Sequence, residues 1–129
     1  MPSKSIIPAP GLPAALGPYN HGVRCGNLLF CAGQIPLDPA TGTLVTGDIR
    51  AQTTQVLRNI QRLLENENLT LEHVLKTTVF LTDLSQFTAM NEVYGQFFTQ
   101  NFPARSTVQV AALPKGAAVE IEVVAHYPD

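Results

Sequence analysis

Arg105 and Glu120 are the charged residues whose positions in this sequence most clearly suggest chemistry. Each belongs to a short segment, 105–110 or 119–123, that alternates polar and apolar residues as a half-buried strand does. Residues 114–116, Pro-Lys-Gly, would turn the chain between them. We expect the valines of both segments to face the core. The charged residues would then face solvent or form a site.

The two side chains have complementary properties. The guanidinium of Arg105 is a planar, two-pronged donor that suits a small carboxylate. Glu120 could hold or deprotonate a water molecule for attack on an electrophilic carbon beside that carboxylate. Tyr19, in a Gly-Pro loop, could add a phenol or a wall to the site, or could be an ordinary interface aromatic. The alternative for the charged residues is a partly buried ion pair that holds the two strands together.

The remaining sequence predicts the elements that would position these residues. Further strands are expected over residues 5–7, 22–25, 28–34 and 74–81. Asp48 would cap a helix that reaches about residue 67. Asp83 and Gln86 would form the capping box of a second helix. The predicted order is therefore β-β-β-α-β-α-β-β.

Amphipathic helices set among such strands predict one two-layer α+β domain over residues 1–129. Its mixed sheet would carry two helices on one face. Because two helices leave the other face uncovered, an apolar far face would call for association of subunits. The low content of charged residues, 14%, agrees with surface buried in an oligomer. Gly33 ends a predicted central strand and marks a place where a neighbouring group can approach closely.

Composition bears on the partners. The net charge of −2 and the scattered Lys and Arg residues argue against nucleic acid. No apolar run is long enough to span a bilayer, and no apolar targeting segment is evident, so we expect a cytoplasmic protein without a membrane partner.

Cys25 and Cys31 would not face each other in the predicted hairpin. We expect both to be small buried residues. With His21 they match no standard metal site, and no metal is expected.

Several segments together resemble the Rid/YjgF family of reactive intermediate deaminases, over nearly the whole chain. They are residues 14–19 (AALGPY), 33–36 (GQIP), 74–81 (VLKTTVFL), 90–94 (MNEVY), and 103–106 (PARS) with 120–122 (EIE). The last pattern is the family's specific signature. The resemblance implies a chorismate-mutase-like α+β fold. It also implies a homotrimer, with the sheets facing inward and three clefts between subunits.

By this resemblance, the chain would hydrolyse enamine and imine intermediates such as 2-aminoacrylate and 2-iminobutanoate to 2-oxo acids and ammonia, without a cofactor. Arg105 would bind the carboxylate of the substrate and Glu120 would position the hydrolytic water. The pocket would be lined by Tyr19, Gly33 and Asn91.

Two positions depart from the common family pattern. Thr107 stands where many members carry Cys, and Ala32 stands where many carry Ser. Thr107 keeps a hydroxyl and a backbone N–H for a bound carboxylate, whereas Ala32 removes one hydrogen-bonding group. These changes concern rate and substrate preference more than reaction class. The alternative function is a regulatory trimer that binds 2-oxo acids and acts through a protein partner, since a sensor needs Arg105 but not Glu120.

Overall fold

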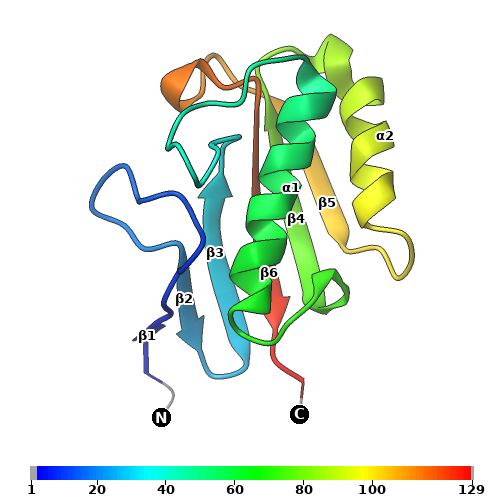
Figure 1. The fold of residues 1–129 in the computed structure, drawn as a ribbon. Helices are drawn as coiled ribbons and strands as arrows, with labels where there is room; N and C mark the ends of the chain where they lie inside the picture. The colour runs from blue at the N-terminus through cyan, green and yellow to red at the C-terminus, as the bar shows by residue number, and fades with distance from the viewer. Residues whose placement is uncertain (1–2, 129) are drawn as a thin grey trace.

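Six strands and two α-helices follow one another in the predicted order (Figure 1), in a computed structural model that describes residues 3–128. They are β1 (Ser5–Ile6), β2 (Gly22–Cys25), β3 (Leu28–Gln34), α1 (Ile49–Glu65), β4 (Val74–Leu81), α2 (Phe87–Phe97), β5 (Ala104–Gln109) and β6 (Val119–His126). Short 3-10 turns precede β4, α2 and β6.

The strands form one mixed sheet in the order β1-β2-β3-β6-β4-β5. β4 and β5 run parallel because α2 connects them as a crossover, and the other neighbours are antiparallel. β6 inserts between β3 and β4. The two segments that carry Arg105 and Glu120 are therefore not paired with each other, because β4 lies between them.

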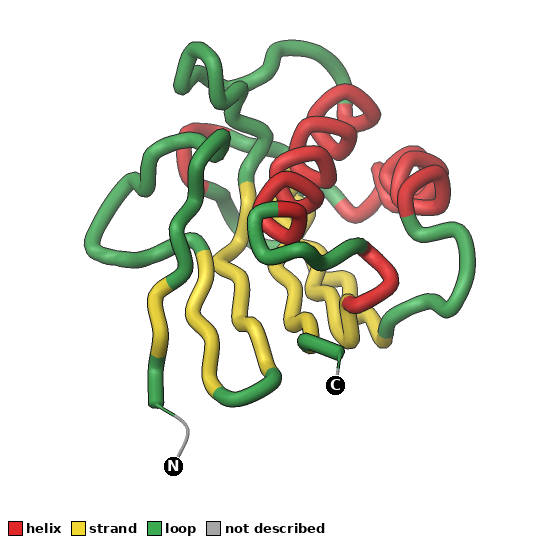
Figure 2. The backbone as a smooth tube through the Cα atoms, turned by 60° about the horizontal axis from the view of Figure 1, so that its bottom comes forward, coloured by secondary structure: helices red, strands yellow, loops and turns green. Residues whose placement is uncertain are grey.

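Both helices cover the same face of the sheet (Figure 2), which confirms the two-layer α+β prediction. The buried stripe of α1 packs on residues of β3, β4 and β6 that alternate along each strand.

β5 differs from the expectation that its valines would face the core. Arg105 is the register partner of the buried Thr77, so it faces the helices. Val108 instead points to the uncovered face, where it is 42% exposed; Phe30 of β3 is 49% exposed on the same face.

The starts of the two helices differ. The carboxylate of Asp48 accepts a hydrogen bond from the Ala51 amide at 3.0 Å, as expected of an N-cap. Asp83 accepts instead from the amide of Ser85 at 2.9 Å and caps a 3-10 turn that precedes α2. The predicted capping box with Gln86 is therefore wrong, because the chain makes this extra turn before the helix begins.

The first hairpin turns at Gly26, whose φ of 62° suits glycine. Cys31 pairs with Gly22 and Cys25 with Leu28, so the cysteines do not face each other, as predicted. Cys31 is buried, and burial raises the pKa of its thiol to about 12. Cys25 is exposed at the tip of the hairpin, so its predicted burial is wrong.

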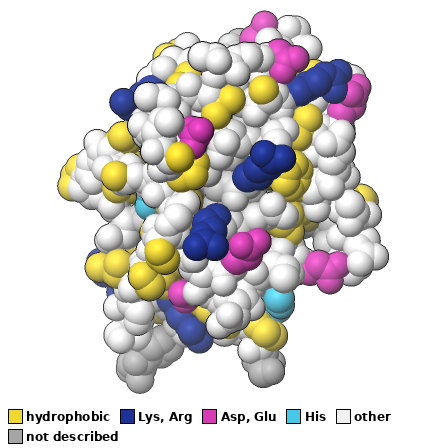
Figure 3. Space-filling model, viewed as in Figure 1, with side chains coloured by type: hydrophobic (Ala, Val, Ile, Leu, Met, Phe, Trp, Pro, Cys, Tyr) yellow, Lys and Arg dark blue, Asp and Glu magenta, His cyan; other side chains and the backbone are white. Residues whose placement is uncertain are grey.

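The helical face of the molecule carries mixed charges. Several basic side chains lie beside acidic ones on the face shown in Figure 3. Arg50 of α1 pairs with Glu92 of α2, and Arg62 and Glu65 approach within 4.0 Å on α1. Exposed pairs of this kind contribute little to stability, because solvent screens their charges. No helix between residues 3 and 128 combines the length and the apolar character that crossing a membrane requires.

Candidate active site

Glu120 lies in β6 and projects into a hollow of about 500 Å³. Its neighbours Val119 and Ile121 are fully buried towards the helices, so the Glu120 side chain must leave the sheet on the opposite, uncovered face. Burial and, to a lesser extent, the charge of Glu122 raise the pKa of its carboxyl group. A carboxylate whose pKa is raised towards the working pH is better suited to accept a proton from water.

Gly33 allows Glu120 to take this position. The register between β3 and β6 shifts between Cys31 and Gln34, a bulge that places Gly33 against the Glu120 side chain. A methyl group added to Gly33 would lie 2.8 Å from the carboxyl carbon of Glu120 and 3.0 Å from its Cγ. The close approach predicted at Gly33 is thus observed, and the approaching group is Glu120.

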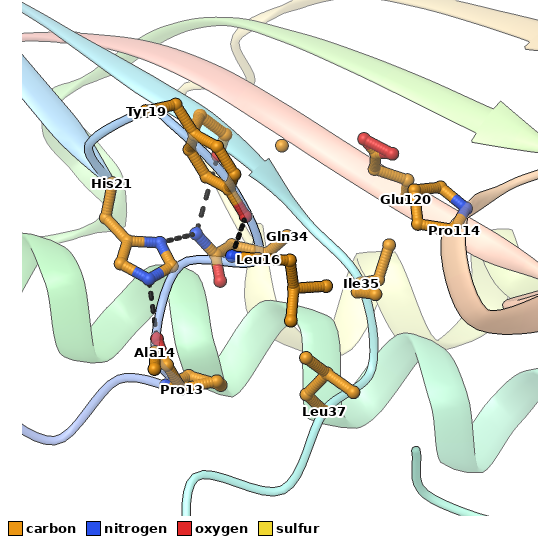
Figure 4. A pocket seen from close by; sticks show the side chains of 12 residues that line it. Pro13, Ala14, Leu16, Tyr19, His21, Gln34, Ile35, Leu37, Pro114 and Glu120 are labelled. Carbon is orange, nitrogen blue, oxygen red and sulfur yellow. Dashed lines mark hydrogen bonds between the residues drawn. The ribbon is translucent and has the colours of Figure 1, made fainter. Parts of the chain in front are cut away.

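The N-terminal loop forms the opposite wall of this hollow (Figure 4). The His21 Nε2–H donates to the carbonyl of Pro13 at 2.6 Å, because a carbonyl can only accept. His21 Nδ1 is then the acceptor for the amide of Gln34, at 3.0 Å. These bonds tie the loop to the end of β3. The ring of Tyr19 lies edge-on to His21, with its hydroxyl accepting from the Leu16 amide at 3.2 Å.

Arg105 lies on the other side of the sheet, against α2. Its Nη1 donates to the Oδ1 of Asn91 at 2.6 Å. The guanidinium carbon is 4.7 Å from the centroid of the Tyr94 ring and 5.4 Å from that of Phe87, within the range of cation–π attraction. The hydroxyl of Tyr94 is hydrogen-bonded to Thr77 Oγ1 at 2.8 Å, which holds the ring in place under the guanidinium.

The structure does not bring Arg105 and Glu120 together within one chain. They occupy opposite faces of the sheet, and within residues 3–128 neither takes part in an ion pair. The alternative of an Arg–Glu ion pair between two strands is therefore wrong. Tyr19 and Gly33 lie with Glu120, whereas Asn91 lies with Arg105.

Thr107 shares the face of Arg105, two residues further along β5. Its hydroxyl is buried and has no hydrogen-bond partner among the described residues. A buried hydroxyl of this kind is suited to a ligand oxygen or a water molecule.

Sequence reasoning did not assign site positions to Gln34, Phe87 and Tyr94. Gln34 directly follows Gly33. The hydrogen bond that its side-chain amide donates to His21 forms only once the N-terminal loop has folded. Phe87 and Tyr94 are apolar residues of the predicted second helix, and nothing local indicates that their rings also support a guanidinium. His21 has both ring nitrogens engaged within the chain. The described residues contain no group of three or more His, Cys, Asp and Glu side chains placed to hold a metal ion.

Comparisons with known proteins agree on one family. Residues 10–127 match the sequence model described as Endoribonuclease L-PSP. A RutC family protein of Pyrococcus horikoshii is 47% identical over 95% of this chain and 98% of its own length. The 2-iminobutanoate/2-iminopropanoate deaminase of Homo sapiens is 42% identical over 95% of this chain and 89% of its own.

Solved structures agree with these sequences. The crystal structure of E. coli TdcF with bound serine superposes with a TM-score of 0.91, is 41% identical, and covers 96% of this chain and 99% of its own. The family model and these relatives each span nearly the whole chain. The chain therefore belongs to the YjgF/Rid family.

Proposed function

We propose that this chain hydrolyses 2-imino acids, and the enamines that tautomerise to them, to 2-oxo acids and ammonia. The main support is the state of the Glu120 carboxylate. It is half-buried, has a raised pKa, forms no ion pair with a described residue, and faces a hollow beside a glycine. A carboxylate in this state can hold a water molecule and accept its proton.

In the proposed reaction, the oxygen of this water attacks C2 of the imine while Glu120 accepts a proton. Glu120 returns that proton to the imine nitrogen, which gives the carbinolamine. Glu120 then transfers the hydroxyl proton of the carbinolamine to the amino nitrogen, the C–N bond breaks, and ammonia leaves as the carbonyl forms. An enamine first gains a proton at C3 and loses one from nitrogen, which gives the imine. Because an imine carbon is already electrophilic, orientation of the substrate and the water can supply much of the acceleration.

Arg105 would bind the carboxylate of the substrate. One of its N–H groups is used by Asn91, and the remaining donors of the planar fork suit a carboxylate. Asn91 thus acts in this proposal by orienting the guanidinium. The unpartnered hydroxyl of Thr107 offers a further donor on the same face.

The two halves of the site would come from different protomers. Because Arg105 and Glu120 lie on opposite faces of one sheet, no single substrate can contact both within one chain. We propose that a homotrimer buries the uncovered faces and places Arg105 of one subunit opposite Glu120, Tyr19 and Gly33 of the next. Phe30 and Val108 would be covered in this assembly.

The relatives support the reaction class. The human relative is named as a deaminase of 2-iminobutanoate and 2-iminopropanoate. The E. coli TdcF structure contains serine, an amino acid with the carboxylate that this proposal assigns to Arg105.

A mixing experiment tests both the reaction and the composite site. A pyridoxal-phosphate serine/threonine dehydratase supplies the enamine, and formation of the 2-oxo acid is followed with each variant. Arg105→Ala and Glu120→Gln should each be inactive. Hybrid trimers made by co-refolding equal amounts should recover about one quarter of wild-type activity, since a quarter of the interfaces would then pair an intact Arg105 with an intact Glu120.

Failure of the hybrids to recover activity, with hybrid trimers present, would contradict the composite site. If wild type adds nothing to the spontaneous reaction, hydrolysis is refuted. Binding of 2-oxobutanoate that depends on Arg105 but not on Glu120 would then support the regulatory alternative.

A further inference from the structure

A second hollow, of about 440 Å³, lies between the second half of α2 and the segment that leads into β5. It is separate from the hollow that contains Glu120. Its wall includes three aromatic side chains and one cationic side chain. The residues that form it include Asn91, Tyr94, Gly95, Phe98, Phe102 and Arg105.

Gly95 is unexplained by the fold. It lies inside α2 with a negative φ, and a methyl group added to it would meet no atom within 4 Å. Glycine is the least favourable residue inside a helix after proline, and alanine would fit here without a clash. A glycine at this position keeps the backbone accessible from the hollow, which is useful if another group approaches the helix there.

Phe102 is also unusual, because its side chain is 70% exposed beside this hollow. Tyr94 and Phe98 stack with their ring centroids 4.5 Å apart and line the same space. Arg105 is bonded there to Asn91, and no described carboxylate pairs with it. Aromatic rings lining a hollow beside a guanidinium without a counter-charge match a ligand that has an apolar group and a carboxylate.

We infer that this hollow receives the apolar side chain of the acid whose carboxylate Arg105 binds, and that the ligands include 2-imino and 2-oxo acids with aromatic side chains. The inference rests on the carboxylate-binding role of Arg105 in the proposed function. The volume of the hollow is within the range of pockets that hold drug-sized ligands, and it exceeds what a four-carbon acid would fill. Gly95 and Phe102 would then determine which side chains are accepted.

Calorimetric titration with two stable 2-oxo acids, phenylpyruvate and 2-oxobutanoate, tests this inference without requiring turnover. Gly95→Leu places a side chain into the hollow. It should lower the affinity for phenylpyruvate relative to that for 2-oxobutanoate by about tenfold. The matched control is Gln96→Leu, which adds a leucine on the exposed side of the same turn and should leave the ratio of affinities unchanged. Gly95→Ala should shift the ratio in the same direction and raise the melting temperature.

Three results would overturn the inference. The first is an equal loss of affinity for both acids in Gly95→Leu, with Gly95→Ala also leaving the ratio unchanged. The second is a change in the oligomeric state of Gly95→Leu relative to wild type, measured by light scattering. Such a change would show that the hollow is a contact between subunits. The third is failure of wild type to bind phenylpyruvate. A wild type that binds both acids with the expected ratios but accelerates no imine hydrolysis would refute the deaminase proposal and leave the side-chain pocket standing.

Discussion

Gly33→Ala is expected to separate activity from stability. Gly33 has no positive φ, so alanine fits the backbone there. The added methyl would lie 2.8 Å from the carboxyl carbon of Glu120, whereas ordinary van der Waals contact begins at about 3.4 Å. The carboxyl group must therefore withdraw by at least ~0.6 Å, the difference between these distances, before the methyl can be accommodated.

This displacement has unequal consequences for the fold and for the chemistry. The carboxylate is the far end of a flexible side chain and can move at little expense. Alanine in place of glycine stabilises a strand by roughly 0.5–1 kcal/mol, which offsets the movement. A misplacement approaching 1 Å in a reacting group can lower a rate about 100-fold, equivalent to about 2.7 kcal/mol of barrier. We expect kcat/KM to fall by about 10- to 100-fold while the melting temperature changes little.

The dehydratase-coupled assay measures kcat/KM, and thermal unfolding followed by circular dichroism measures the melting temperature. Glu120→Asp provides the control, because its carboxylate is withdrawn by one methylene. In that background Gly33→Ala should reduce kcat/KM by a smaller factor than in wild type. An equal factor in both backgrounds would show that the methyl acts on something other than the Glu120 carboxylate. Full activity of Gly33→Ala would refute the positioning argument itself.

Two further predictions follow from the pKa shifts. The Glu120 pKa is raised by burial and by the charge of Glu122, so kcat/KM should increase as the pH rises through a value above that of an ordinary glutamate. Removing that charge with Glu122→Gln should move this acidic limb to lower pH, and an unmoved limb would exclude Glu122 as a cause. Cys31 has a pKa raised to about 12, whereas Cys25 is exposed. Iodoacetamide at pH 8 should therefore label only Cys25 until the protein is unfolded, as mass spectrometry can determine.

Local sequence patterns predicted the helices and strands well, because the start of a helix or the turn of a hairpin depends on residues that are close in the chain. The Asp48 cap needs only the amide of Ala51, three residues away. The hairpin needs only a Gly26-Asn27 turn between the adjacent segments 22–25 and 28–34. The close approach at Gly33 was also predicted, since a glycine inside a strand often marks a place where another group packs against the backbone. The identity of the approaching group, Glu120, depends on the pairing of β3 with β6, which are far apart in the chain, and was not predicted.

The faces of β5 could not be assigned locally. Alternation shows that Arg105 and Val108 lie on opposite faces but does not show which face the helices cover. The expectation that the valines would be buried was wrong for this strand. Here the rings of Tyr94 and Phe87 attract the guanidinium, and Val108 faces the uncovered side. The insertion of β6 between β3 and β4 is likewise a long-range pairing that no local pattern encodes.

The separation of Arg105 from Glu120 has a consequence for the proposed chemistry. Had the two side chains shared one face, each would have stabilised the charge of the other, lowering the carboxyl pKa and occupying the guanidinium donors. In the structure Arg105 is held by a neutral amide and two rings, which leaves its charge uncompensated. Glu120 is held against a glycine with its pKa raised. If the subunits assemble as proposed, the two charged groups meet across an interface with space for a substrate between them. Assembly is then what creates the catalytic site, so an isolated subunit would contain both residues and still be unable to use them on one molecule.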